Sequence, residues 1–404
     1  MLTDTAIDKL MQPIIDRQED INTYVLQLIA RRIHTIGRMS PSDLRKLETL
    51  YFMGSDIREL NATLADYTAL QVNDIKAMIK EVALDSYIDA KPFYDYRHKS
   101  YIPFEQNRSL QQLVTAIGNE TAETYRNLAN SHATGFLISD KKHPQILRFM
   151  PIENTYNRVM DEAIQAVVSG TLDFNVAMRR TVNQLVDSGI RKIYWDSGYT
   201  QRVDSAVRRN LLGGIKKIHM ETEALIGKEI GADGVELSVH YNSAPDHEPI
   251  QGHQFTNEEF ENLQSDRYFE DVKGNKFDAI PRAIGTWNCR HFTSSIIVGV
   301  TKPRFSDSQL SEIMRLNAQG FDMPNGKHLT MYECTQRQRM LETKIREAKD
   351  GQNTFRTSGD KKEAKKYQAR VNKYLTQYEA FSKACGLKMK RDRISVHGYR
   401  KIKV

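Results

Sequence analysis

The sequence lacks the long apolar stretch of a membrane-spanning helix. No apolar run approaches the ~18 residues that such a helix requires. The N-terminal stretch MLTDTAIDKLMQPIIDRQED carries acidic side chains from the start, unlike the charged and then apolar layout of a secretion signal. Charged residues make up 27% of the chain. We therefore expect a soluble protein with neither a secretion signal nor a membrane anchor.

Cysteine is also scarce. The 404 residues include three cysteines, Cys289, Cys334 and Cys385. An odd number at wide spacing argues against a disulfide framework and fits a reducing cytoplasm. The chain has no C-x-x-C pair and no H-x-x-x-H motif, so the spacing is not that of a recognised zinc finger or zinc protease. Internal repeats and low-complexity tracts are absent as well.

The positive charge of the chain is concentrated at its C-terminal end. Residues 331–404 contain 20 Lys and Arg against 8 Asp and Glu, a net charge of +12, whereas the whole chain carries +7. The preceding 330 residues therefore carry −5. Such a segment indicates a polyanion, or an acidic protein surface, as its neighbour.

Hydrophobic periodicity predicts a mainly helical protein. Apolar residues recur every three or four positions over 7–28, 155–189 and 199–231, as on the buried face of an amphipathic helix. The pattern changes at VELSVHY (235–241) and FTSSIIVGV (292–300), which are typical of strands. We predict a mainly α fold with a small inserted α+β module, in an elongated, multi-segment helical architecture. Its expected parts are a helical docking region at 1–150, a helical region with one long helix at 151–235, the α+β module at 236–304, and a basic helical hairpin with a C-terminal tail at 305–404.

Two basic helices are expected after residue 331, joined by the polar loop DGQNTFRTSGD at 350–360 as an αα-hairpin. No groove-reading motif is visible, so any contact with nucleic acid is expected to go to phosphates. A solvated charged face and an acidic protein partner are the alternatives. The candidate nucleic-acid contacts are Lys361, Lys362, Lys365, Lys366, Lys388, Lys390, Arg391 and Arg393.

Two motifs contain residues of the kinds that build polar and metal sites. They are VHYNSAPDHEPIQGHQF, which begins at Val239, and GTWNCRH, which ends at His291. The interpretation that we favour is a structural latch between a turn and a strand. In it His247 donates to a buried carbonyl or carboxylate, Asp246 fixes the turn, and Arg290 clamps a carboxylate, for which Asp246 and Glu248 are candidates. The candidate site residues are His240, Asp246, His247, Gln251, Gly252, Asn288, Cys289, Arg290 and His291.

The same residues leave two other interpretations open. His240, His247, His253, Cys289 and His291 are of the ligand types that zinc prefers, although we assign no metal and no cofactor from the sequence. A Cys–His nucleophile would need Cys289 activated by a base and an oxyanion hole beside it. In the latch, Cys289 is a small buried apolar residue and Gly252 permits the backbone to reverse.

Together the two motifs resemble the signature of the tailed-phage minor capsid protein family, which is related to the phage Mu-type head morphogenesis proteins. The resemblance covers roughly residues 150 to 400. The Arg of the family's Ala-Arg-Pro is absent, because Ala244 directly precedes Pro245, and Ile250 stands where an aromatic residue is common. The matching positions are His240, Pro245, His247, Gln251, Gly252, Gly285, Asn288, Cys289, Arg290 and His291.

The resemblance implies a structural virion component without enzymatic activity. It implies assembly in the host cytoplasm and a place in the capsid interior or at the portal vertex. The implied partners are the portal protein, the major capsid protein, or both, and packaged double-stranded DNA is a further candidate. Two rival interpretations are a metal-dependent hydrolase or nuclease that uses the His/Cys residues, and a sequence-independent DNA-binding protein ejected with the genome.

Overall fold

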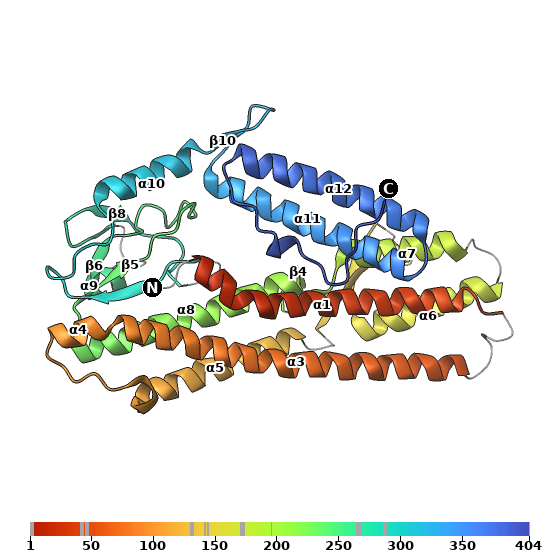
Figure 1. Ribbon diagram of the computed structural model, residues 1–404, viewed down its shortest axis with the longest axis horizontal. Helices are drawn as coiled ribbons and strands as arrows, with labels where there is room; N and C mark the ends of the chain where they lie inside the picture. The colour runs from red at the N-terminus through yellow and green to blue at the C-terminus, as the bar shows by residue number, and fades with distance from the viewer. Residues whose placement is uncertain are drawn as a thin grey trace. The chain divides into compact units, whose positions relative to one another are not determined.

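Helices dominate the structure and short strands form small sheets (Figure 1). The predicted fold class, mainly α with a small α+β module, is therefore confirmed. None of the helices in the part of the chain that the structure describes has the length and apolar character needed to cross a bilayer. The structure is a computed structural model, and it describes residues 4–40, 44, 48–129, 133–140, 143, 145–169, 174–194, 196–263, 268–285 and 289–403.

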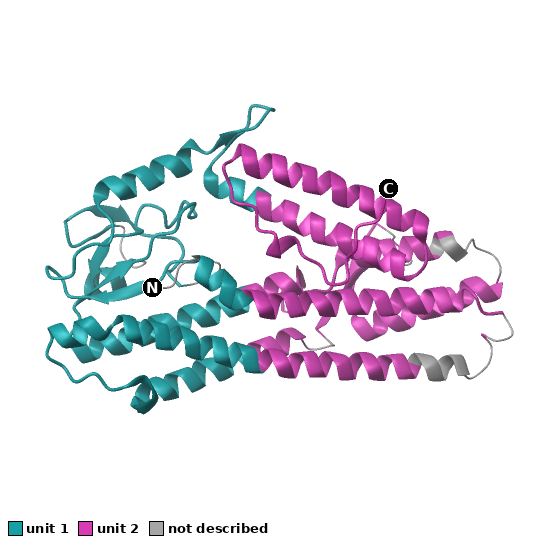
Figure 2. Cartoon of the chain, viewed as in Figure 1, with its two compact units in different colours: residues 1–11, 73–123, 209–337 teal, residues 12–72, 124–208, 338–404 magenta. Residues whose placement is uncertain are grey.

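The chain folds into two units, each assembled from three stretches of sequence (Figure 2). Unit 1 comprises residues 1–11, 73–123 and 209–337, and unit 2 comprises residues 12–72, 124–208 and 338–404. The four parts expected from the sequence, 1–150, 151–235, 236–304 and 305–404, stay a prediction about organisation. The helices with residues in both units are α1 (Asp4–Ile36), α3 (Glu48–Asp89), α5 (Arg108–Ala129), α8 (Val203–Ile230) and α11 (Met331–Thr357).

Unit 1 contains the predicted α+β module. Its main sheet has the antiparallel order β6-β5-β9, in which Glu236 lies opposite Gln254 on one side and Ser294 on the other. The predicted strands at 235–241 and 292–300 are present as the shorter β5 and β9. Leu237, Ile250, Phe255 and Phe269 belong to the hydrophobic core of the module. The elements confined to unit 1 are α4 (Lys91–Tyr96), η1 (Phe104–Gln106), β5 (Gly234–Leu237), β6 (Gln254–Thr256), α9 (Asn257–Asn262), β7 (Tyr268–Glu270), β8 (Lys276–Asp278), β9 (Thr293–Ile296), α10 (Asp307–Gln319), β10 (Phe321–Asp322) and β11 (His328–Leu329).

Unit 2 combines helices with a four-stranded antiparallel sheet of order β2-β1-β3-β4. This sheet is an addition to the sequence-based prediction, which placed no strand there. The elements confined to unit 2 are β1 (Thr134–Ser139), β2 (Leu147–Pro151), α6 (Ile152–Ser169), α7 (Phe174–Ser188), β3 (Arg191–Tyr194), β4 (Tyr199–Arg202), α12 (Lys361–Ala384) and η2 (Asp392–Ile394).

The α11–α12 hairpin is present, but the predicted loop at 350–360 is wrong. Helix α11 continues to Thr357, so that residues 358–360 alone connect the two helices. Tertiary contacts explain the difference. The Asp350 carboxylate accepts hydrogen bonds from Asn22 Nδ2 (2.9 Å) and Thr23 Oγ1 (3.1 Å). A Cβ on Gly351 would lie 2.2 Å from the Tyr367 ring, so this glycine serves close helix packing rather than a turn.

The segment after α12 is held against α11 by side chains that bind its backbone carbonyls. Arg346 donates to the carbonyl of Arg393 (2.6 Å), and Lys349 donates to that of Ile394 (2.5 Å). Asn353 donates to the carbonyl of His397 at 3.1 Å. Asn353, which lies in the stretch predicted as a loop, therefore acts as one of the anchors for the tail.

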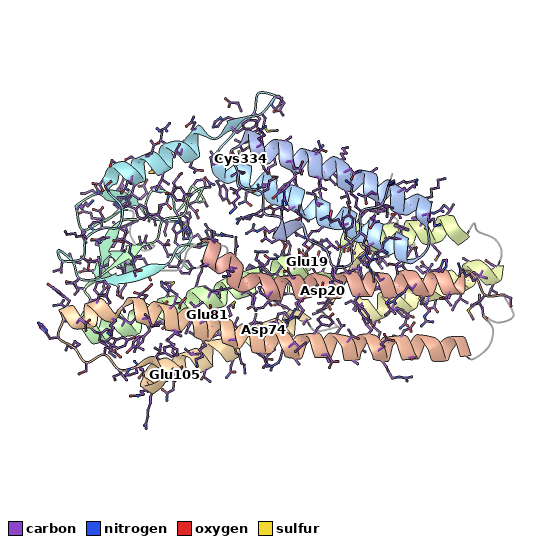
Figure 3. The ribbon with its side chains drawn as sticks, viewed as in Figure 1. Glu19, Asp20, Asp74, Glu81, Glu105 and Cys334 are labelled. Carbon is purple, nitrogen blue, oxygen red and sulfur yellow. The ribbon has the colours of Figure 1, made fainter. Side chains whose placement is uncertain are left out.

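Unit 2 contains a partly buried ionic cluster, defined here as Glu19, Arg202, Asp204, Arg346, Glu347 and Asp350. Glu19 belongs to α1 (Figure 3). Arg346 lies 3.0 Å from carboxylate oxygens of both Glu19 and Asp204, and Arg202 lies 3.2 Å from Asp204 and 3.3 Å from Glu347. The cluster thus sets two guanidinium groups against four carboxyl groups.

Because the carboxyl groups outnumber the guanidinium groups, some carboxyl groups have a raised pKa and another has a lowered pKa. Burial raises the pKa of Glu19 to about 8 although Arg346 opposes the shift, and burial likewise raises the pKa of Asp350 to about 6. Burial also acts on Asp204, but Arg202 and Arg346 outweigh it and lower the pKa of that carboxyl to about 2. Glu19 is therefore protonated at neutral pH while Asp204 carries the charge.

We predict that the contribution of Glu19 to the free energy of unfolding decreases as the pH rises from about 4.5 to 8. Over this range the folded protein keeps a proton on Glu19 that the unfolded chain releases, because the folded pKa of about 8 exceeds the ordinary 4.5. The slope is at most about 1.4 kcal/mol per pH unit for one such group. Urea unfolding of wild type and Glu19→Gln at several pH values measures it. The stability of wild type relative to the variant should decrease as the pH rises through this range, because the variant lacks the titrating proton.

Glu379→Gln is the matched control, because Glu379 is an exposed glutamate on α12 in the same unit. It should keep the wild-type dependence on pH. Equal slopes for wild type and Glu19→Gln would contradict the assignment of a raised pKa to Glu19.

Candidate functional site

Three residues of the two sequence motifs, His247, Cys289 and His291, come together in unit 1. One ring nitrogen of each histidine and the Sγ of Cys289 all lie within 4.8 Å of one another. The three residues are buried, with 1%, 2% and 3% of their surface exposed. We call them the His247–Cys289–His291 cluster.

The antiparallel sheet explains why the motifs meet. His247 lies in the segment between β5 and β6, whereas Cys289 and His291 precede β9. Because β5 pairs antiparallel with both β6 and β9, the residues after β5, before β6 and before β9 lie at the same end of the sheet. Two motifs about forty residues apart in sequence are thereby joined.

Hydrogen bonds fix the tautomers of both histidines. His247 Nε2 lies 2.6 Å from the carbonyl oxygen of Arg282, which can only accept, so Nε2 carries the proton. Gln251 Oε1 accepts from the backbone N–H of His240 (2.9 Å) and lies 3.3 Å from His291 Nε2. His291 Nε2 is therefore also the protonated nitrogen, and its Nδ1 lies 3.7 Å from Cys289 Sγ.

The backbone around these residues follows the predicted latch in part. Gly252 has a φ of +75°, in the region that favours glycine, and its N–H donates to the carbonyl of Leu237 (3.1 Å). The predicted donation from His247 to a buried carbonyl is confirmed by its bond to Arg282. His240 also lies beside the cluster, with its ring centroid 4.9 Å from that of His291, but its Nε2 is 2.9 Å from Ser238 Oγ.

The predicted partners of Arg290 are wrong. Asp246 pairs with Arg282 through two bonds of 2.9 and 3.0 Å, and Glu248 accepts from Asn317 (2.7 Å). Arg290 lies instead 3.7 Å from Asp8, at the start of α1. The sequence gives no sign of this pair because its members are far apart along the chain. Asn288 lies outside the described residues.

The remaining histidine of the motif, His253, has a separate role. Its Nδ1 lies 2.7 Å from the carboxylate of Asp271, and it is not a member of the cluster. The sequence-based set of ligand types thus divides into three clustered residues, a neighbour (His240) and a residue engaged elsewhere (His253).

The cluster favours a thiolate on Cys289. Burial alone would raise the pKa of this thiol, but the adjacent imidazoles of His247 and His291 and the charge of Lys216 lower it to about 4. Lys216 lies on α8 and is buried, which lowers the pKa of its ammonium group to about 8. Sequence reasoning missed Lys216. The available signal was a lysine next to Ile215 on the apolar face of a long helix.

The geometry of the His247–Cys289–His291 cluster favours a role in holding the two sequence motifs together over a role as a catalytic nucleophile. Cysteine nucleophiles of enzymes are typically at least partly exposed, whereas Cys289 is 2% exposed and also belongs to the core of the module.

The basic residues predicted to contact nucleic acid are mostly on the surface of unit 2. Lys361, Lys362, Lys365 and Lys366 are exposed on α12, and Lys366 Nζ lies 2.7 Å from Glu363. Lys388 and Arg391 are exposed and Lys390 is half-buried, all three in the segment after α12.

Arg393 is the exception, because it is buried and does not lie on the surface predicted to contact nucleic acid. It is 7% exposed, its guanidinium lies 3.9 Å from Glu342, and its carbonyl is bound by Arg346. Three further cations on α12, Arg370, Lys373 and Lys383, are exposed and were not among the predicted contacts. The α12 basic face is defined here as Lys361, Lys362, Lys365, Lys366, Arg370 and Lys373.

Comparison with known proteins gives one result. The family model described as Phage minor capsid protein 2 matches residues 2–382, nearly the whole chain. Neither the curated proteins nor the solved structures give a match.

We predict that Gln251→Ala destabilises the protein. The substitution removes the acceptor shared by His240 N–H and His291 Nε2–H, both of which are buried. Each donor left without a partner costs about 1–3 kcal/mol. Urea unfolding of the full chain should register this loss. Gln336→Ala, at an exposed position of α11, is the control and should change stability little. Equal stability of the two variants would contradict the shared role of Gln251.

Proposed function

The chain belongs to the phage minor capsid protein 2 family, and from that premise we propose that this structural phage protein contacts packaged double-stranded DNA inside the head through the α12 basic face. The structural role in a virion follows from membership of this family. The DNA contact is our proposal, and the observation that supports it is the distribution of charge on α12.

The α12 basic face is a nearly continuous row of cations. The face runs from Lys361 to Lys373 on α12, which at ~1.5 Å per residue is about 18 Å, close to half a turn of B-DNA. Lys362, Lys366 and Arg370 follow one another at intervals of four residues, so they lie on one side of the helix. Glu379 is the exposed carboxylate on this helix, beyond the basic face, because Glu363 is buried.

Such a row suits phosphates rather than base edges. Lys side chains meet phosphates as point charges on flexible stems, and phosphate contacts position a protein on DNA without reading its sequence. A protein that lies beside a packaged genome must bind DNA of any sequence, and phosphate contacts allow this.

The expected protein partners are the portal protein, the major capsid protein, or both. We propose that the protein sits in the capsid interior or at the portal vertex after assembly in the host cytoplasm. The support for this placement is family membership together with the motif resemblance. Residues 1–150, which are mainly helical but include β1 and most of β2, are the proposed docking region.

We predict that the full-length protein binds duplex DNA with an affinity that falls steeply with salt. Each neutralised phosphate contributes roughly −0.9 to the slope of log affinity against log salt concentration. Replacing Lys361, Lys362, Lys365 and Lys366 together by Gln should make the slope shallower by roughly 0.9 for each phosphate that is no longer neutralised. A filter-binding titration with two DNA sequences of equal length measures the slope and the absence of sequence preference.

The matched control is replacement of four exposed lysines of unit 1, Lys76, Lys80, Lys91 and Lys99, by Gln. It removes the same charge and should leave the slope near the wild-type value. If wild-type protein does not bind duplex DNA at about 50 mM salt, where phosphate contacts are strong, the DNA proposal fails and an acidic portal surface becomes the better partner.

We predict that the protein stays in the head and lies next to the portal. A cryo-electron map of the portal vertex should contain density for the α11–α12 hairpin beside DNA. Quantifying the protein in particles before and after genome release tests the rival interpretation, because a protein ejected with the genome would be lost from emptied heads.

A further inference from the structure

We propose that His247, Cys289 and His291 bind a zinc ion that fastens the turn between β5 and β6 to the segment before β9. The inference concerns unit 1 and does not depend on the proposed DNA contact. It rests on the geometry of the cluster and on the hydrogen-bonding capacity of its three side chains.

Both histidines present the same ring nitrogen to a metal. Nε2 of His247 donates to the carbonyl of Arg282, and Nε2 of His291 donates to Gln251 Oε1. The lone pair of each neutral imidazole is therefore on Nδ1. His291 Nδ1 lies 3.7 Å from Cys289 Sγ, and His247 Nδ1 is buried without a hydrogen-bond partner among the described residues.

The protons available to the cluster cannot satisfy this arrangement. A Cys289 thiol has one proton, so it can serve the lone pair of one imidazole and leaves the other unpaired. If the proton moves to one imidazole, the thiolate then faces the lone pair of the other. A cation at the centre would satisfy the sulfur and both nitrogens at once.

The dimensions of the cluster suit zinc. Bonds of ~2.3 Å to sulfur and ~2.0–2.1 Å to nitrogen at tetrahedral angles place ligand atoms roughly 3.3–3.6 Å apart. The distance of 3.7 Å between Cys289 Sγ and His291 Nδ1 is close to this range. The three ligand atoms lie within 4.8 Å of one another, so a small rotation of the side chains closes the site.

The surroundings are also those of a metal site. Metal-bound histidines usually donate their second ring N–H to a carbonyl, a carboxylate or water, which fixes the orientation of the ring. Arg282 and Gln251 supply such acceptors here. Lys216 is the cation that balances the thiolate in the absence of metal, and zinc would take over that role. Three protein ligands leave one tetrahedral position for a small ligand such as water.

Zinc content of the full-length protein is the first test. Protein incubated with excess zinc and then desalted should retain about one ion per chain by elemental analysis, and Cys289→Ser should retain less than about a tenth of that. Cys334→Ser is the matched control, because Cys334 is a buried cysteine elsewhere, 3.9 Å from the Leu329 carbonyl. Wild-type protein without zinc, or Cys289→Ser with wild-type zinc content, would overturn the proposal.

Cobalt provides a test that does not require a variant to fold. Wild-type protein loaded with Co²⁺ should show the near-ultraviolet charge-transfer absorption of a cobalt–thiolate bond and the visible bands of a tetrahedral ion. Gln251→Ala, which releases His291, should weaken metal affinity about 10- to 100-fold. His253→Gln should leave affinity unchanged. Loaded protein without thiolate absorption would overturn the assignment of Cys289 as a ligand.

Discussion

Unit 2 depends on a carboxylate that joins two distant parts of the chain. Asp350 accepts hydrogen bonds from Asn22 and Thr23, which lie 328 and 327 positions earlier. Asn22 also accepts from the backbone of Ile190, so three segments meet at one point. A buried carboxylate is costly unless it is bonded in this way or neutralised. The surrounding ionic cluster, the continuation of α11 and the anchoring of the C-terminal tail all follow from the placement of this region of α11 against α1.

The local elements of this fold could be predicted because their signals are local. The stripe of α1, the long helix α8 and the alternation that marks β5 are visible in consecutive residues. The stretch at 350–357 could not be predicted, because its Gly, Asn and Thr residues favour a loop in isolation and tertiary contacts override that preference. The sheet formed by β1 to β4 was missed for a different reason. Its strands, TGFLIS, LRFMP, RKIY and YTQR, show no clear alternation of apolar and polar residues.

The candidate site likewise has a part that could be predicted from local sequence and a part that could not. The identities of His247, Cys289 and His291 could be predicted, since chemically distinctive residues at turn–strand junctions are visible in any sequence. Their convergence required the pairing of β5 with β6 and β9. The partner of Arg290 and the presence of Lys216 depend on which helices cover the module, and no local pattern carries that information. The residue types of the site could therefore be predicted from the sequence, whereas their arrangement could not. The arrangement is what bears on whether the latch is made of hydrogen bonds alone or includes a metal.

The division of each unit among three stretches of chain has a consequence for biosynthesis. Unit 1 needs residues up to 337 and unit 2 needs residues up to 404, so unit 2 cannot be completed before the last 67 residues have been made, whereas all residues of unit 1 are present earlier. The early helices must wait with their apolar faces uncovered, and contacts between such distant residues form slowly. The residues of unit 1 are therefore all available before those of unit 2, so the two units become able to fold at different times.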